Sequence, residues 1–173
     1  MAPTYRLLDP QQALALTKQM RELYAEVYAE PPYCEGPQFV ARFTEHYTEE
    51  LDLPGFSLTA ATDGELLLGA CYGWTMVAGR WFSSPTVEPP AEIMNVEKFA
   101  IMEWMVRQPH RQLGIGRKLL DLVLTDRPEP YAILASNPDA PARQIYEKRL
   151  GWQFCGSTEG GFMPPMDILA LRL

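Results

Sequence analysis

The sequence predicts a mixed fold of class α/β (α+β), in which helices alternate with the strands of one central sheet. Three observations lead to this class. Apolar residues recur with a helical period near the start of the chain, and from Gly55 onward they form runs of strand length. Helical and strand patterns then alternate through the rest of the sequence. Hairpin-like neighbours at the beginning and end of the series indicate a mixed sheet rather than a purely parallel one.

Two helices are expected near the start, after a short strand at residues 4–9. The first covers residues 10–30, where leucine, methionine and valine recur at about helical spacing, and Pro31 stops it. The second covers residues 37–51, whose aromatic and aliphatic residues line one face before Pro54. Both patterns are typical of amphipathic helices.

Strands are expected in the middle of the chain. Residues 55–77 indicate two strands joined at Asp63 and Gly64, a dipeptide that favours tight hairpin turns. Residues 78–91 contain three prolines and are expected to form an irregular loop. The long apolar run at residues 93–106 predicts a further strand, in which one face is shared by positions 97, 99, 101, 103 and 105.

The remaining patterns alternate between helix and strand. A helix is expected from residue 115 to about 125, a buried strand at residues 130–136 and a helix at residues 139–151. Strands at residues 152–156 and 166–173 complete the series. The whole pattern predicts a mixed central sheet of about six to seven strands flanked by about four helices.

Composition indicates one globular domain that spans residues 1–173. The chain is 47% hydrophobic, which is enough to bury a core without disulfides or a metal. No stretch approaches the roughly 20 apolar residues of a membrane span, and the first ten residues contain neither a basic segment nor an apolar run. We therefore expect a cytoplasmic protein without a membrane partner.

The cysteines and histidines do not predict a metal site. Cys34, Cys71 and Cys155 are isolated and odd in number, as expected for reduced thiols. His46 and His110 complete no familiar ligand spacing with them. We expect no bound metal.

Charge is unevenly distributed along the sequence. The formal net charge is -7, with -9 on residues 1–103 and +2 on residues 104–173. Nucleic-acid binding is disfavoured, because it requires a concentrated basic face. The asymmetry suits a cationic partner for the first part and an anionic one for the second, although simple solvation of the charges explains it equally well.

A glycine-rich segment, "RQLGIG" at residues 111–116, indicates an anion site. Gly114 and Gly116 allow a ligand to approach the backbone closely, and the helix that follows directs unsatisfied N–H groups toward it. The segment lacks the pattern of a P-loop, and Leu119 stands where a dinucleotide motif would need its third glycine. A phosphate group is the expected ligand; taken alone, the segment would indicate only a tight turn into a helix.

The same segment resembles a family motif. "RQLGIG" fits the pattern [Q/R]-x-x-G-x-[G/A] of the GNAT acetyltransferase superfamily, and "EWMVRQPH" precedes it in the place of that family's long fourth strand. "NPDAPARQIYEKRLGW" resembles the family's closing helix with its tyrosine and Gly-aromatic pair. Two departures are present: Gln108 takes the usual place of a proline, with Pro109 next, and one extra residue separates Tyr146 from Gly151.

The resemblance implies a GNAT-like fold and acetyl-CoA as the acyl-donor substrate. The amides after the strand would bind the pyrophosphate, with Arg111, Arg117 and Lys118 adding positive charge. The end of the strand would follow the pantetheine arm, and the N–H of Val106 would stabilise the oxyanion. The residues expected to bind the donor are Met105, Val106, Arg111, Gln112, Leu113, Gly114, Ile115, Gly116, Arg117 and Asn137.

Two residues are expected to move protons. Glu103 is the preferred base, because a partly buried carboxylate in an apolar strand has a raised pKa. Glu97 on the same face and a bridging water are alternatives, and Glu103 is otherwise a structural carboxylate paired with Arg107 or Lys98. Tyr146 is the preferred acid, because relatives have a tyrosine at this helical position. Otherwise it is a packing aromatic.

The acceptor is expected to be the primary amine of a small molecule, attacking the donor directly in a ternary complex. Acids and aromatics in the expected acceptor segments suit a cationic amine: they are Glu26, Tyr28, Glu30, Tyr33, Glu35, Trp74 and Trp81. The alternatives are a protein lysine or N-terminal acetyltransferase and a non-catalytic acyl-CoA-binding module. The resemblance also allows a homodimer.

Overall fold

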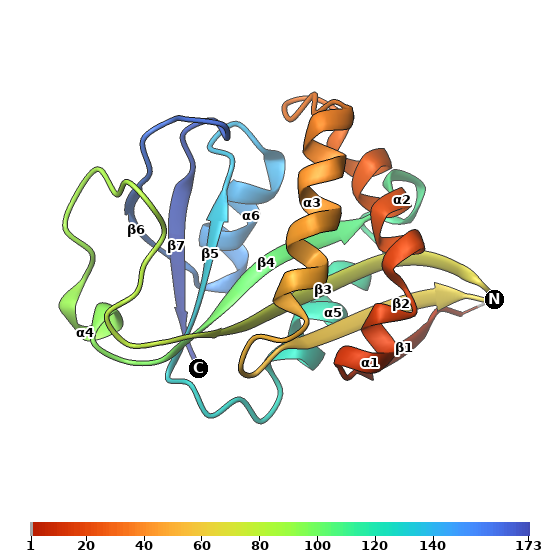
Figure 1. The fold of residues 1–173 in the computed structure, drawn as a ribbon, viewed down its shortest axis with the longest axis horizontal. Coiled ribbons are helices and arrows are strands. Elements are labelled where there is room, and N and C mark those ends of the chain that lie inside the picture. Colours follow the sequence, from red (N-terminus) through yellow and green to blue (C-terminus); the bar gives the residue numbers. More distant parts are fainter. Residues whose placement is uncertain (1) are drawn as a thin grey trace. The chain divides into compact units, whose positions relative to one another are not determined.

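The computed structural model describes residues 2–173, and Figure 1 shows their path through helices and strands. Seven strands form a sheet in the order β1-β2-β3-β4-β5-β7-β6. Strands β1 to β3 pair antiparallel, β4 and β5 pair parallel, and β7 pairs antiparallel with both β5 and β6. The predicted mixed sheet is therefore confirmed.

The chain divides into two units, one formed by residues 2–74 and 102–125 and the other by residues 75–101 and 126–173. Strands β3 and β4 each run from one unit into the other. Elements that begin in the first unit are β1 (Thr4–Leu8), α1 (Pro10–Leu14), α2 (Thr17–Tyr28), α3 (Pro37–Glu50), β2 (Ser57–Asp63), β3 (Leu66–Met76) and α5 (Ile115–Leu124). Those that begin in the second are α4 (Ala91–Met94), β4 (Lys98–Val106), β5 (Tyr131–Ser136), α6 (Pro141–Leu150), β6 (Gln153–Ser157) and β7 (Asp167–Arg172).

The predicted helix at residues 10–30 is two helices, α1 and α2. Asp9 caps α1 through a reciprocal pair of hydrogen bonds with Gln12. The helix then ends, and the Thr17 hydroxyl donates to the carbonyl of Leu14 at 2.7 Å. Leu14 is exposed, so the apolar stripe of the longer helix does not extend through it. The expected single helix is therefore interrupted at Ala15 and Leu16.

Aromatic side chains fill the core between α2, α3 and the first strands. Tyr24 of α2 stacks on Phe43 of α3 with ring centroids 4.2 Å apart. Phe43 in turn contacts Tyr47, whose ring meets Tyr72 of β3 edge-on at 5.2 Å. The buried Tyr47 hydroxyl donates a hydrogen bond to the carbonyl of Ala13. This packing fixes both helices against one face of the β2–β3 pair.

The predicted strand at residues 93–106 is shorter than expected and begins at Lys98. The residues before it form α4, and the fully buried Lys98 ammonium donates to the carbonyls of Val77, Met94 and Val96 at 3.2 Å each. These bonds satisfy carbonyls at the end of α4, so the chain leaves the helix before entering the strand. Glu97 therefore lies outside the strand and is exposed.

None of the helices in residues 2–173 is long and apolar enough to cross a membrane. Across the same residues, no group of three or more histidine, cysteine, aspartate or glutamate side chains is arranged to hold a metal ion.

Candidate active site

The glycine-rich segment lies between the end of β4 and the start of α5. A 3-10 turn, η1 (Gln108–His110), follows the strand with Pro109 in its first positions, so the displaced proline still supports a bend. Gln112 and Gly114 have φ angles of 64° and 79°. Only glycine adopts such a conformation without strain, which explains Gly114 immediately before the helix.

The first turn of α5 presents backbone donors. The helix begins at Ile115 with no side-chain cap, and its first internal bond runs from the N–H of Lys118 to the carbonyl of Gly114. Its preceding N–H groups, on Ile115, Gly116 and Arg117, therefore have no partner within the helix. Together with the positive end of the helix dipole, they form a site suited to an anion.

Gly116 packs against β4, but its backbone conformation does not require a glycine. An added Cβ would lie 3.4 Å from Trp104 Nε1 and 3.6 Å from Val106 Cγ2, which is ordinary van der Waals contact. Trp104 Nε1 donates to the carbonyl of Gly116 at 2.9 Å and fixes the first turn of α5 to the strand. The fold thus leaves room for alanine at position 116. A ligand bound close to this backbone would limit the size of the side chain there more strongly than the fold does.

The cations of this segment already have partners. Arg111 forms a bidentate ion pair with Glu30, at 2.7 and 3.1 Å, and the Arg111 Nε donates to the carbonyl of Val106 at 2.9 Å. Arg117 pairs with Asp121 of the next turn, an exposed pair of small energetic value. The backbone N–H groups are therefore the uncommitted donors of the segment's predicted anion site.

Glu103 lies on β4, three residues before Val106, and is partly buried. The Tyr28 hydroxyl donates to its Oε2 at 2.5 Å. The pKa of Glu103 is raised to about 8: burial is the main cause, the bond from Tyr28 opposes it, and the nearby Glu35 and Glu50 carboxylates add to it. Glu103 thus becomes a carboxylate that exchanges its proton near neutral pH.

The salt-bridge partners suggested for Glu103 by the sequence are bound elsewhere. Arg107 pairs with Glu26 of α2, and its Nε donates to the carbonyl of Leu67 at 2.7 Å. Lys98 is occupied by the three carbonyls at its own end of β4. The interpretation of Glu103 as a carboxylate paired with either cation is therefore wrong.

The acids of the expected acceptor segments, Glu26, Glu30 and Glu35, differ in whether an arginine pairs with them. Glu26 and Glu30 are each neutralised by an arginine, whereas Glu35 accepts from the Tyr24 hydroxyl and burial raises its pKa. Tyr33 packs edge-on against Tyr28, with ring centroids 4.8 Å apart. Of the three expected acceptor acids, Glu35 is therefore the one without a cationic partner, as is the expected base Glu103.

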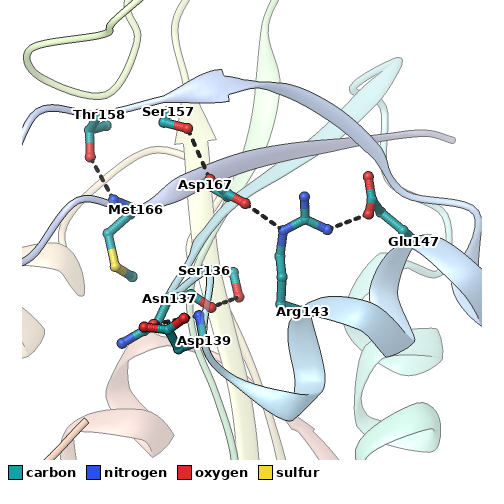
Figure 2. A network of polar contacts seen from close by, with 9 residues as sticks. All are labelled: Ser136, Asn137, Asp139, Arg143, Glu147, Ser157, Thr158, Met166 and Asp167. Carbon is teal, nitrogen blue, oxygen red and sulfur yellow. Dashed lines mark hydrogen bonds and ion pairs between the residues drawn. The ribbon is translucent and has the colours of Figure 1, made fainter. Parts of the chain in front are cut away.

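The second unit carries the other expected site residues. The Asn137 side-chain oxygen accepts the N–H of Asp139 at 2.9 Å, which forms the turn between β5 and α6 (Figure 2). In the same view, Arg143 bridges Asp167 of β7 and Glu147 of α6, at 2.9 and 2.7 Å. This buried arginine, which the sequence analysis did not single out, fixes the start of α6 to the sheet.

Tyr146 lies on α6, one turn after Arg143. Gly151 ends the helix with a φ of 76°, and the N–H of Trp152 donates to the carbonyl of Tyr146 at 3.2 Å. The Tyr146 and Trp152 rings lie 6.4 Å apart at a tilted angle. The extra residue before Gly151 is thus absorbed by the helix and its left-handed cap.

The chain belongs to the acetyltransferase (GNAT) family, whose model matches residues 17–152. It is thus identified as an N-acetyltransferase, and the predicted resemblance is confirmed. No curated protein matches the sequence significantly.

Several solved structures share the fold over nearly the whole chain. Aminoglycoside 6'-acetyltransferase type Ii has a TM-score of 0.65 and 15% identity over 98% of this chain and 96% of that one. PaiA N-acetyltransferase from Thermoplasma acidophilum, in complex with coenzyme A, has a TM-score of 0.67 and 13% identity over 100% of both chains. NAA60 from Arabidopsis thaliana, with a bisubstrate analogue, has a TM-score of 0.66 and 13% identity over 98% and 97%. At these identities the likeness establishes the fold.

Proposed function

We propose that the chain acts as a single acyl-CoA-dependent domain that moves an acetyl group from acetyl-CoA to the primary amine of a small molecule. The observation that carries this proposal is Glu103, a partly buried carboxylate with a pKa of about 8, located on β4 just before the glycine-rich segment. One strand thus runs from the proposed base toward the proposed anion site. That combination suits attack by an amine on a phosphate-bearing donor.

The donor is proposed to bind through backbone atoms. The N–H groups at the start of α5 support a pyrophosphate site, and the β4 segment at Met105 and Val106 would lie along the pantetheine arm. Structures that share the fold include ones solved with CoA or acetyl-CoA, which supports acetyl-CoA as the donor. Asn137 is proposed as a further donor contact through its side-chain amide.

Acyl transfer then requires two proton movements. Glu103 accepts a proton from the acceptor amine, directly or through a water, and the amine nitrogen bonds to the thioester carbonyl carbon. The Val106 N–H stabilises the resulting oxyanion. The carbon–sulfur bond breaks, and the Tyr146 hydroxyl gives the departing sulfur its proton. The second proton that the nitrogen loses on becoming an amide restores the Tyr146 hydroxyl, and Glu103 releases its own proton to solvent. Products are the acetylated amine and free CoA.

The acceptor is proposed to be a small cationic molecule. Glu35 and Glu103 are acids without a cationic partner, and a bound cation would favour the ionised form of each. The rings of Tyr24, Tyr28 and Tyr33 lie beside them. Two aminoglycoside acetyltransferases are among the proteins that share the fold. N-terminal acetylation is the competing assignment, because the fold is equally similar to NAA60.

Calorimetry and a thiol-release assay test the proposal. We expect saturable binding of acetyl-CoA and CoA but not ATP, and release of CoA thiol with at least one small amine. Tyr146→Phe is expected to slow turnover while leaving CoA affinity nearly unchanged, since it removes only the acid. Turnover confined to peptides would assign the competing function. Binding without turnover on any amine or peptide would indicate a non-catalytic module.

A further inference from the structure

Tyr28 is the side chain that contacts the proposed base. Its hydroxyl donates to Glu103 Oε2 at 2.5 Å, although the residues are 75 positions apart in the sequence. Burial and the neighbouring Glu103 carboxylate raise the pKa of the Tyr28 hydroxyl well above its usual value. The hydroxyl therefore remains protonated, and it acts as a permanent donor to Glu103.

The Tyr28 ring is held from two sides by other aromatic rings. Tyr24, one helical turn earlier, lies 4.5 Å away at a tilted angle, and Tyr33 meets it edge-on at 4.8 Å. Tyr24 is itself stacked on Phe43 of α3. The ring is thus built into the α2–α3 packing, and its hydroxyl has little freedom to leave Glu103.

Two ion pairs flank Tyr28 along α2 and the turn that follows. Glu26, two residues earlier, pairs with Arg107, and Glu30, two residues later, pairs with Arg111. Both arginines also donate to backbone carbonyls near β3 and β4. The pairs have matched spacing, because each glutamate lies 81 positions before its arginine. They tie the end of α2 to the end of β4 on both sides of the tyrosine.

We propose that Tyr28 is a positioning residue for the reaction, that it orients the Glu103 carboxylate toward the acceptor amine, and that the two flanking ion pairs hold it in place. This inference rests on the proposed function, in which Glu103 is the base. It assigns to α2 a role beyond lining the acceptor side. The helix also sets how readily the base gains and loses its proton.

Other groups around Glu103 do not replace this bond. Glu35 and Glu50 are anions that raise the pKa of Glu103, which is opposite to the effect of Tyr28. The remaining titratable groups facing it have pKa values raised by burial and stay neutral where Glu103 titrates; they are Tyr24, Tyr33, Cys71 and Tyr72. Removing the Tyr28 hydroxyl therefore leaves the ionised carboxylate less stabilised.

The test is the pH dependence of kcat/KM in Tyr28→Phe, measured beside the wild type. Loss of a hydrogen bond to an ionised group is expected to move the rising limb upward by about one pH unit or more, from a wild-type midpoint near 8. At neutral pH this corresponds to a roughly ten-fold lower kcat/KM. The KM for acetyl-CoA should stay close to that of the wild type, because the donor contacts are elsewhere.

Tyr47→Phe is the matched control. Its hydroxyl is also buried in the first unit but donates to the carbonyl of Ala13, so its loss should leave the midpoint unmoved. A midpoint in Tyr28→Phe equal to that of the wild type would overturn the positioning role and leave the proposed function standing. A wild type that acetylates no amine would overturn the proposed function itself.

A second measurement does not need turnover. Proteins labelled with ¹³C at the glutamate carboxyl, with Glu103→Gln to assign the resonance, report the titration of Glu103 directly by NMR. A higher midpoint in Tyr28→Phe than in the wild type supports the inference. Equal midpoints in the two proteins refute it, whatever the activity of either.

Discussion

Gly69 of β3 supports the β4 segment that is proposed to bind the donor. A Cβ at this position would lie 2.7 Å from the carbonyl oxygen of Met105, where ordinary contacts begin at 3.4 Å. It would also lie 3.2 Å from side-chain atoms of Leu119 and Val106. Gly69→Ala must therefore displace the β4 backbone by about 0.7 Å or distort β3 by a similar amount, since the closest atom belongs to the main chain.

We expect Gly69→Ala to lower the free energy of unfolding by about 1–3 kcal/mol, the usual cost of overpacking, measured by urea denaturation. Acetyl transfer should fall further than stability alone explains, because misplacing a reacting segment by about 1 Å can cost about a hundred-fold in rate. Gly161→Ala is the control, since nothing lies within 4 Å of its added Cβ. Equal stability and turnover of the two variants would refute this account of the β3–β4 contact.

Two further predictions concern charge. Gly116→Asp should weaken CoA binding by about ten-fold or more in calorimetry, because it places an anion beside the proposed pyrophosphate site. The control variant Gly116→Ala should fold normally. Unchanged CoA affinity in a folded Gly116→Asp variant would show that the segment does not bind the donor. The pKa of Glu103 is about 8 in the folded protein and 4.5 in the unfolded chain, so the folded state binds more protons between these pH values. The contribution of Glu103 to the free energy of unfolding is therefore full below pH 4.5 and declines as the pH rises to 8. Glu103→Gln should flatten that slope in pH-dependent denaturation, and an identical slope in both proteins would contradict the raised pKa.

Local patterns were sufficient to predict most of the fold. The expected hairpin joins β2 to β3, but its turn residues are Gly64 and Glu65, one position later than predicted, because Asp63 still pairs with Leu66. Gly64 has a φ of 58°. The missed boundaries have a different origin. Lys98 ends α4 by bonding three carbonyls, including that of Val77, 21 positions earlier, and hydropathy carries no signal for such a bond.

The candidate site was less predictable because its contacts join distant parts of the chain. The motif located the donor segment and Glu103, but pairs such as Glu30 and Arg111 are 81 positions apart and follow no local period. The sequence predicts that Arg111 contacts the donor and that Glu30 belongs to the acceptor side. The structure joins them to each other, and only the tertiary fold could reveal that pairing.

These ion pairs change the meaning of the charge asymmetry. Part of the acidic excess of the first 103 residues is matched by arginines of the basic part, since Glu26 and Glu30 meet Arg107 and Arg111. Glu103 remains without a cation, and a pKa near 8 makes it well suited to an amine. Taking a proton from an alkylammonium group with a pKa near 10.4 is uphill by about 2 pK units for such a base, against about 6 for an ordinary glutamate. Burial raises the pKa of Glu103 and the hydrogen bond from Tyr28 limits that rise. Glu103 is thus a stronger base than an ordinary glutamate and still ionises near neutral pH.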